Sequence, residues 1–213
     1  MPGILLAPFT NNTRSAILAR LLTLHGLPGA VESKGPEGKP FLQMPDGSRR
    51  GLAITHLRET KMPLSLMAVA DEPMFAIDAE AWPRAVTDET FLNAIAAPED
   101  VAVIARLKAR GRDAGTALWA IKEAALKASG EVMNEPRNIS VELSPNGHYW
   151  AATSASATAP VPTAKVGLWH CKMLNSSQSG LLAVAFAAPL SGKVGLTEEI
   201  WVNAPDFALE IVS

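Results

Sequence analysis

Residues 114–129 constrain the fold of this chain most, because their apolar and polar side chains separate with the spacing of an amphipathic helix. One side of the predicted helix is apolar and carries Leu118, Ile121, Ala125 and Ala128. The other side carries side chains four positions apart, Trp119, Glu123 and Lys127. Asp113 or Thr116 can cap the first turn, and Gly130 can take the left-handed conformation that ends a helix. We therefore predict a helix over 114–129 that holds a carboxylate and an ammonium side by side.

A strand with a carboxylate face precedes this helix. Residues 74–80 alternate, so that one face is apolar and the other carries Ala76, Asp78 and Glu80. Two carboxylates one strand repeat apart repel each other, and either a solvated sheet edge or a bound cation relieves the repulsion. Taken alone, Glu123 and Lys127 form an exposed ion pair worth about 0.3–0.5 kcal/mol. A third carboxylate on the helix favours the bound cation.

The ligand types favour Mg²⁺ over zinc. Carboxylate oxygens are hard ligands that suit Mg²⁺, whereas Cys171 is the only thiol. The histidines lack zinc-site spacing; they are His25, His56, His148 and His170. The sequence also contains neither G-x-x-x-x-G-K-[ST] nor a G-x-G-x-x-G after a strand. A bound phosphate would therefore be held by side chains and the metal.

These segments resemble the 4'-phosphopantetheinyl transferase superfamily, specifically the larger single-chain kind that activates surfactin synthetase. The family's G-[IV]-D-x-E strand stands here as residues 76–80, with alanine in place of glycine, and its W-x-x-K-E-[AS]-x-x-K helix stands as residues 119–127. Its Gly-Lys-Pro turn is matched by residues 38–40, and its Ser-His pair by residues 55–56. An acidic residue that opens a helix between the two carboxylate motifs is matched by Glu99.

The resemblance implies a Mg²⁺-dependent 4'-phosphopantetheinyl transferase of the holo-acyl-carrier-protein synthase type. Such an enzyme transfers the phosphopantetheine arm of coenzyme A to a serine of an apo acyl or peptidyl carrier protein and releases adenosine 3',5'-bisphosphate. By resemblance, the metal ligands are Asp78, Glu80 and Glu123. Attack on a diphosphate spreads negative charge over phosphoryl oxygens. Lys127 would stabilise that charge, with Lys122 as a weaker candidate whose alternative role is a side chain that extends to solvent.

The resemblance also implies residues for proton transfer and for coenzyme A. Glu99 matches the general base that takes the serine proton, although an acidic residue after proline also complements a helix dipole. Thr55 and His56 match the pair that holds the 3'-phosphate of coenzyme A, with threonine in place of the usual serine. Lys39 and Arg14 match further phosphate contacts, for which the forked guanidinium of arginine is well suited.

The predicted elements mix strands and helices without βαβ regularity, which indicates an α+β fold. Besides 114–129, we expect helices near 13–25, 87–96 and 99–109 and strands near 4–8, 30–33, 51–55, 65–70, 74–80, 139–143, 149–153, 165–172 and 181–187. The resemblance implies two similar α/β halves related by a pseudo-twofold axis, with the ligand between them. We place the N-terminal half at residues 1–75 and the C-terminal half, which carries the metal site, at residues 76–213.

Composition argues against two classes of partner. The net charge of −2 and the lack of a basic, aromatic-interleaved stripe argue against nucleic acid. The longest apolar run, residues 181–190, contains Pro189 and falls far short of the roughly 20 residues that span a membrane. A single cysteine permits no internal disulfide, and the amino terminus lacks the positive region of a signal peptide. We therefore expect a cytoplasmic monomer that binds no membrane.

Two other functions remain open at this point. A non-catalytic relative would bind coenzyme A or a similar nucleotide without transferring any group, and Ala76 in place of glycine motivates that alternative. A Mg²⁺-dependent phosphohydrolase would use the same carboxylates with water as the nucleophile. It would release products without a carrier protein.

Overall fold

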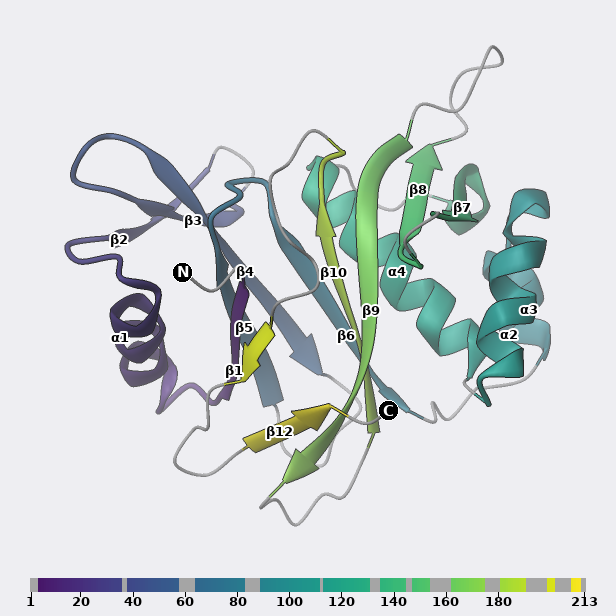
Figure 1. Cartoon of the computed structure of the whole chain (residues 1–213), viewed down its shortest axis with the longest axis horizontal. Coiled ribbons are helices and arrows are strands. Elements are labelled where there is room, and N and C mark those ends of the chain that lie inside the picture. Colours follow the sequence, from purple (N-terminus) through teal and green to yellow (C-terminus); the bar gives the residue numbers. More distant parts are fainter. Residues whose placement is uncertain are drawn as a thin grey trace.

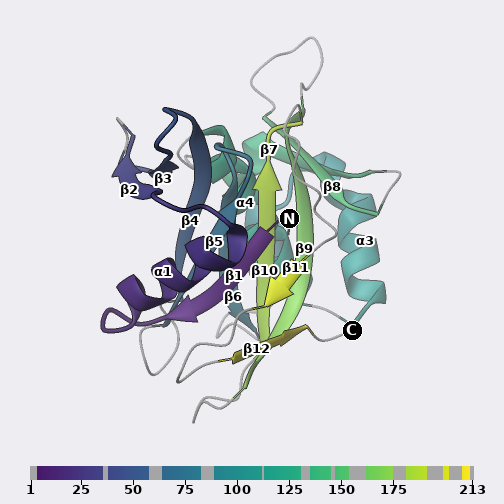
Figure 2. The ribbon, with the colours of Figure 1, turned by 60° about the vertical axis from the view of Figure 1, so that its left-hand side comes forward.

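The computed structural model shows an α+β fold in which two antiparallel sheets lie side by side between helices (Figure 1). It describes residues 4–35, 38–57, 64–82, 89–111, 113–130, 135–144, 147–153, 162–174, 181–190, 199–201 and 208–211. Helices α1 and α3 lie on opposite sides of the molecule with the sheets between them, in both views (Figures 1 and 2). Among the helices of these ranges, none has the length and apolar character to cross a membrane.

The first sheet has the strand order β11-β1-β5-β4-β3-β2. Its strands are β1 (Ile4–Phe9), β2 (Val31–Lys34), β3 (Pro40–Gln43), β4 (Arg49–Leu57), β5 (Leu64–Ala70) and β11 (Glu199–Trp201). All neighbours are antiparallel except β11, which pairs parallel with β1. Helix α1 (Arg14–His25) packs on β1 and β5 and ends at Gly26, whose φ of 70° is left-handed.

The second sheet has the strand order β6-β10-β9-β8-β7, and β12 pairs with β9. Its strands are β6 (Ala76–Trp82), β7 (Ile139–Leu143), β8 (Tyr149–Thr153), β9 (Pro162–Leu174), β10 (Leu181–Ala188) and β12 (Ala208–Ile211). The helices between β6 and β7 are α2 (Glu89–Ile95), α3 (Val101–Ala109) and α4 (Ala114–Ser129), with the short 3₁₀ helices η1 (Pro98–Asp100) and η2 (Pro136–Asn138). Helix α4 packs across β6, β10 and β9.

The two sheets repeat one strand order. Strands β1–β5 have the order β1-β5-β4-β3-β2, and strands β6–β10 have the matching order β6-β10-β9-β8-β7. In both runs the first strand pairs with the fifth, and the others follow in descending order. The predicted α+β class is therefore confirmed. The pseudo-twofold axis and the division at residue 75 stay predictions; β11 returns from late in the chain to pair with β1.

Strand β6 separates two hydrophobic cores. Phe75, Ile77 and Ala79 pack into the core around the first sheet, while Ala76 packs into the core around α4. Since strand side chains alternate, Asp78 and Glu80 lie on the same face as Ala76, toward α4. The predicted division of this strand into an apolar face and a carboxylate face is confirmed.

Most predicted elements are present, and α4 has the predicted bounds. Asp113 is its N-cap, accepting a hydrogen bond from the backbone N–H of Thr116 at 3.1 Å, and Gly130 ends it with a φ of 78°. Strands β3, β11 and β12 were not predicted. Strand β3 begins with a proline, a residue that local sequence patterns assign to turns more readily than to strands. Strands β11 and β12 have only three and four residues, too few to show an alternating pattern.

Candidate active site

Strand β6 and helix α4 bring the predicted carboxylates to one place. Asp78 and Glu80 lie opposite Ala185 and Ala183 of β10. Cross-strand partners share a face, so small side chains stand beside the two carboxylates and leave room for them. Glu123 projects from α4 toward the same region, because it lines the same cavity as Asp78 and Glu80.

This cavity has a volume of about 540 Å³ and lies between three elements. Strand β4 contributes residues 54–57, β6 contributes residues 78–81, and α4 contributes Trp119, Glu123 and Lys127. The polar stripe predicted for α4 therefore faces the cavity as a unit. Six predicted site residues are brought together here: Thr55, His56, Asp78, Glu80, Glu123 and Lys127.

Lys127 links the two elements that carry the acids. Its Nζ lies 2.5 Å from Oδ1 of Asp78 and 3.9 Å from Oε2 of Glu123. Thr55 Oγ1 also donates a hydrogen bond to Oδ1 of Asp78, at 3.3 Å. The other oxygen, Oδ2, is buried and has no hydrogen-bond partner among the residues that the structure describes. Asp78 is thus held firmly by one oxygen and presents a second oxygen that lacks a donor or a cation.

The electrostatics of Glu123 also favour a cation. Burial raises the pKa of Glu123; Lys127 opposes that shift, and Asp78 raises the pKa further. A divalent cation would stabilise the ionised carboxylate that burial and Asp78 disfavour.

The donor set fits Mg²⁺, although it is not assembled as a closed cage. Carboxylate oxygens are the preferred protein ligands of this ion, which commonly keeps several waters. The buried, unpartnered Oδ2 of Asp78 is the atom that most clearly requires such a partner. Over the residues that the structure describes, no three His, Cys, Asp or Glu side chains cluster tightly enough to form a ready-made metal site.

A second cavity of about 620 Å³ adjoins the first and shares Ile54 and Lys127 with it. Its cationic lining residues are Lys39, Arg49 and Lys127. Lys39 Nζ donates to the backbone carbonyl of Lys127 at 2.6 Å and to that of Met74 at 3.4 Å. The predicted phosphate contact Lys39 therefore lies next to the last turn of α4.

Burial shifts the pKa of Lys39. It lowers the pKa of Lys39 to about 8, against the opposing charge of Glu72. Across the same cavity, the guanidinium of Arg49 lies 4.4 Å from the ring centroid of Phe41, which orders this second cation by a cation–π contact.

Two predicted phosphate contacts, His56 and Arg14, have partners on different strands. His56 Nδ1 forms a 2.6 Å hydrogen bond with Ser65 Oγ of β5. Arg14 itself pairs with Glu32 at 2.5 Å. It lines neither of the two cavities described above.

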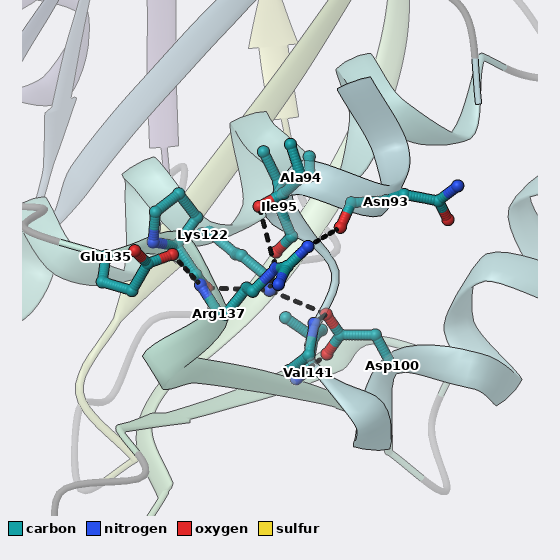
Figure 3. A network of polar contacts seen from close by, with 10 residues as sticks. Asn93, Ala94, Ile95, Asp100, Lys122, Glu135, Arg137 and Val141 are labelled. Carbon is teal, nitrogen blue, oxygen red and sulfur yellow. Dashed lines mark hydrogen bonds and ion pairs between the residues drawn. The ribbon is translucent and has the colours of Figure 1, made fainter. Parts of the chain in front are cut away.

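Glu99 and Lys122 also lie outside both cavities. Glu99 is exposed on η1. Lys122 is fully buried on α4, and its Nζ lies 2.7 Å from Oδ2 of Asp100. It also donates to the backbone carbonyls of Ile95 at 2.8 Å and Pro136 at 3.0 Å (Figure 3). Burial lowers the pKa of Lys122, and Asp100 opposes that shift.

Asp100 completes a buried network that the sequence did not reveal. Its carboxylate accepts hydrogen bonds from the backbone N–H of Ala97 at 2.8 Å and of Val141 at 2.7 Å. Nearby, Arg137 donates to the carbonyls of Asn93 and Ala94 (Figure 3). The only local sequence feature of Asp100 was its position as a second acid directly after Glu99. The network thus ties η1, η2, α2 and β7 to α4.

Comparison with known proteins supports the interpretation of these motifs. A search of curated proteins found no match to the chain. The family model of the 4'-phosphopantetheinyl transferase superfamily matches residues 74–183, more than half of the chain. This span runs from β6 into β10 and includes all of α4, so it contains Asp78, Glu80 and Glu123. The chain therefore belongs to the 4'-phosphopantetheinyl transferase superfamily.

Proposed function

We propose that this protein transfers the 4'-phosphopantetheine arm of coenzyme A to a serine of an apo acyl or peptidyl carrier protein. Membership of the superfamily assigns phosphopantetheinyl transferase activity in general. The observation that carries the specific proposal is the convergence of Asp78, Glu80, Glu123 and Lys127 on one cavity. In the reaction, a bond forms between the serine oxygen and phosphorus as the diphosphate bond breaks. Adenosine 3',5'-bisphosphate leaves, and the serine proton passes to a base.

Asp78, Glu80 and Glu123 are the proposed Mg²⁺ ligands. The free, buried Oδ2 of Asp78 and the burial-raised pKa of Glu123 support this assignment. When bound, Mg²⁺ supplies positive charge that stabilises the charge developing on the phosphoryl oxygens. The three carboxylates would hold the ion at the cavity between β4, β6 and α4.

The lysines around the cavity take different proposed parts. Lys127 is 39% exposed and projects among the carboxylates, so its ammonium can donate to a phosphoryl oxygen. Lys39 lies beside it and is proposed as a second phosphate contact. Lys122 is buried with three acceptors, and we assign it a positioning part: it fixes α4, which carries Glu123 as the next residue.

The remaining assignments rest on the resemblance. His56 lines the cavity and is proposed to hold the 3'-phosphate of coenzyme A. Arg14, whose guanidinium pairs with Glu32, is proposed as a further phosphate contact. Glu99 is the proposed general base. Its exposed position on η1 is accessible to a serine presented by a carrier protein.

The test is intact-protein mass spectrometry of several apo carrier proteins incubated with this protein, coenzyme A and Mg²⁺. A parallel reaction contains a chelator. We expect one carrier to gain the mass of one phosphopantetheine in the reaction without chelator, and no carrier to gain it in the reaction with chelator. Release of adenosine 3',5'-bisphosphate without any carrier would instead support the phosphohydrolase. Coenzyme A binding without any mass gain on any carrier would support the non-catalytic relative.

A further inference from the structure

The two carboxylate oxygens of Asp78 have opposite surroundings. Oδ1 accepts hydrogen bonds from Lys127 Nζ at 2.5 Å and from Thr55 Oγ1 at 3.3 Å. Oδ2 is buried, and no donor in the described part of the chain forms a hydrogen bond with it. A carboxylate can rotate about its bond to Cβ and exchange its two oxygens, unless donors fix one of them. The two donors on Oδ1 therefore decide which oxygen is left available.

Thr55 is the more rigid of these two donors. It is 4% exposed on β4, whereas the side chain of Lys127 is 39% exposed and flexible. The branched Cβ of threonine restricts its χ1 rotamers, so the hydroxyl keeps its direction better than that of serine would. Strands β4 and β6 pack together, and Thr55 contacts Asp78 across that packing.

The neighbouring histidine has a separate contact. His56 forms its hydrogen bond with Ser65 of β5, whereas Thr55 donates to Asp78 of β6. Thr55 and His56 thus have different partners in this structure. A hydroxyl engaged with Asp78 is not free to donate to a phosphate at the same time, since it carries one proton.

We infer that Thr55 is a positioning residue for the metal ligand Asp78: its hydroxyl holds Oδ1 so that Oδ2 stays available to a divalent cation. This inference rests on the proposed metal site. It differs from the 3'-phosphate contact that the resemblance implies for Thr55. Residues that orient a metal ligand through a hydrogen bond typically change metal affinity or activity by about 10- to 100-fold when removed.

The test compares Thr55→Val with Thr55→Ser. Valine keeps the branched shape and removes the hydroxyl, whereas serine keeps the hydroxyl. Mn²⁺ affinity is measured by electron paramagnetic resonance of free Mn²⁺, with coenzyme A at saturating concentration. We expect Thr55→Val to weaken Mn²⁺ binding about 10- to 100-fold and Thr55→Ser to restore most of it. Circular dichroism and urea unfolding confirm that both variants fold.

Two controls separate the inference from the proposed function. If Asp78→Asn and Glu123→Gln weaken Mn²⁺ binding but Thr55→Val does not, the inference is wrong and the metal site stands. If neither Asp78→Asn nor Glu123→Gln weakens it, the metal site itself is wrong, and the inference with it.

Coenzyme A and 3'-dephospho-coenzyme A distinguish the two roles of Thr55. If Thr55→Val raises the KM for coenzyme A alone and leaves Mn²⁺ affinity unchanged, Thr55 contacts the 3'-phosphate and the inference is overturned. A positioning residue predicts equal effects on the two substrates, because both carry the diphosphate.

Discussion

Two lysines of helix α4 each pair with an aspartate from another element, and the two pairs differ in how many of their polar atoms have partners. Lys122 and Asp100 lie 2.7 Å apart with both side chains at 0% exposure. The lysine has two further carbonyl acceptors, and the aspartate has two backbone donors. Lys127 and Asp78 lie 2.5 Å apart with exposures of 39% and 6%. Here one aspartate oxygen is buried and, over the described ranges of the chain, has no hydrogen-bond partner.

The difference separates a structural ion pair from a candidate reaction site. A buried charge costs several kcal/mol unless hydrogen bonds and an opposite charge satisfy it. Asp100 and two backbone carbonyls satisfy the charge of Lys122. The pair at Lys127 is not fully satisfied: Oδ2 of Asp78 has no partner among the described residues. A second carboxylate, that of Glu123, lies 3.9 Å from the same ammonium. A charge arrangement that is satisfied only with a ligand bound is typical of binding and catalytic sites.

The largest expected effect is on stability, at the complete pair. Lys122→Met leaves the Asp100 charge buried without its ammonium, so the free energy of unfolding should fall by about 3–5 kcal/mol. Urea unfolding followed by circular dichroism measures it. The double variant Lys122→Met with Asp100→Asn should lose less than Lys122→Met alone, because no buried charge is left over and the amide oxygen still offers an acceptor to the backbone. A loss below about 1 kcal/mol for Lys122→Met would remove the distinction between the two pairs.

The second effect concerns activity, at the incomplete pair. Asp78→Asn should lower the rate of transfer at least about 100-fold, because it weakens a proposed metal ligand. The free energy of unfolding should change by no more than about 1 kcal/mol, since Lys127 is part-exposed and stays solvated. Carrier mass gain and urea unfolding measure the two quantities on the same preparation. An Asp78→Asn variant that unfolds as readily as Lys122→Met would show that both pairs are structural.

The smallest effect is a pH dependence of stability from Lys39, which supports the last turn of α4 at Lys127. Burial lowers its pKa from 10.5 to about 8. Between these values the unfolded chain binds more protons than the folded one, so stability rises with pH. The free energy of unfolding of the wild type, minus that of Lys39→Met, should therefore increase between pH 8 and 10.5. A flat or falling difference would mean that Lys39 is not held in a desolvated position.

Local sequence determined α4 and β6 almost completely. The helix has a 3.6-residue apolar period, an Asp113 cap and a glycine stop, and all three act within a few residues. Alternation in β6 placed Asp78 and Glu80 on one face for the same reason. These two elements carry the proposed metal ligands, so that part of the candidate site followed from pattern and from the family resemblance.

Long-range contacts were beyond sequence reasoning. Asp100 of η1 reaches Lys122 of α4 only in the folded chain, and Thr55 meets Asp78 only because β4 and β6 pack together. Strand β11 lies almost 200 residues from its partner β1. No local period records such pairings. The helix spacing placed Lys127, but not Lys122, on the polar side with Glu123. It could not reveal that Lys122 is buried against Asp100.

Glu123 provides the most direct test of the central claim, that the cavity between β4, β6 and α4 is a metal-dependent transfer site. Wild-type protein and Glu123→Gln are each incubated with coenzyme A, Mg²⁺ and an apo carrier protein that the wild type modifies, and the carrier mass is followed with time. We expect the wild type to add one phosphopantetheine and Glu123→Gln to add none, with an unchanged circular dichroism spectrum. Full activity of Glu123→Gln would remove Glu123 from the metal site and contradict the account.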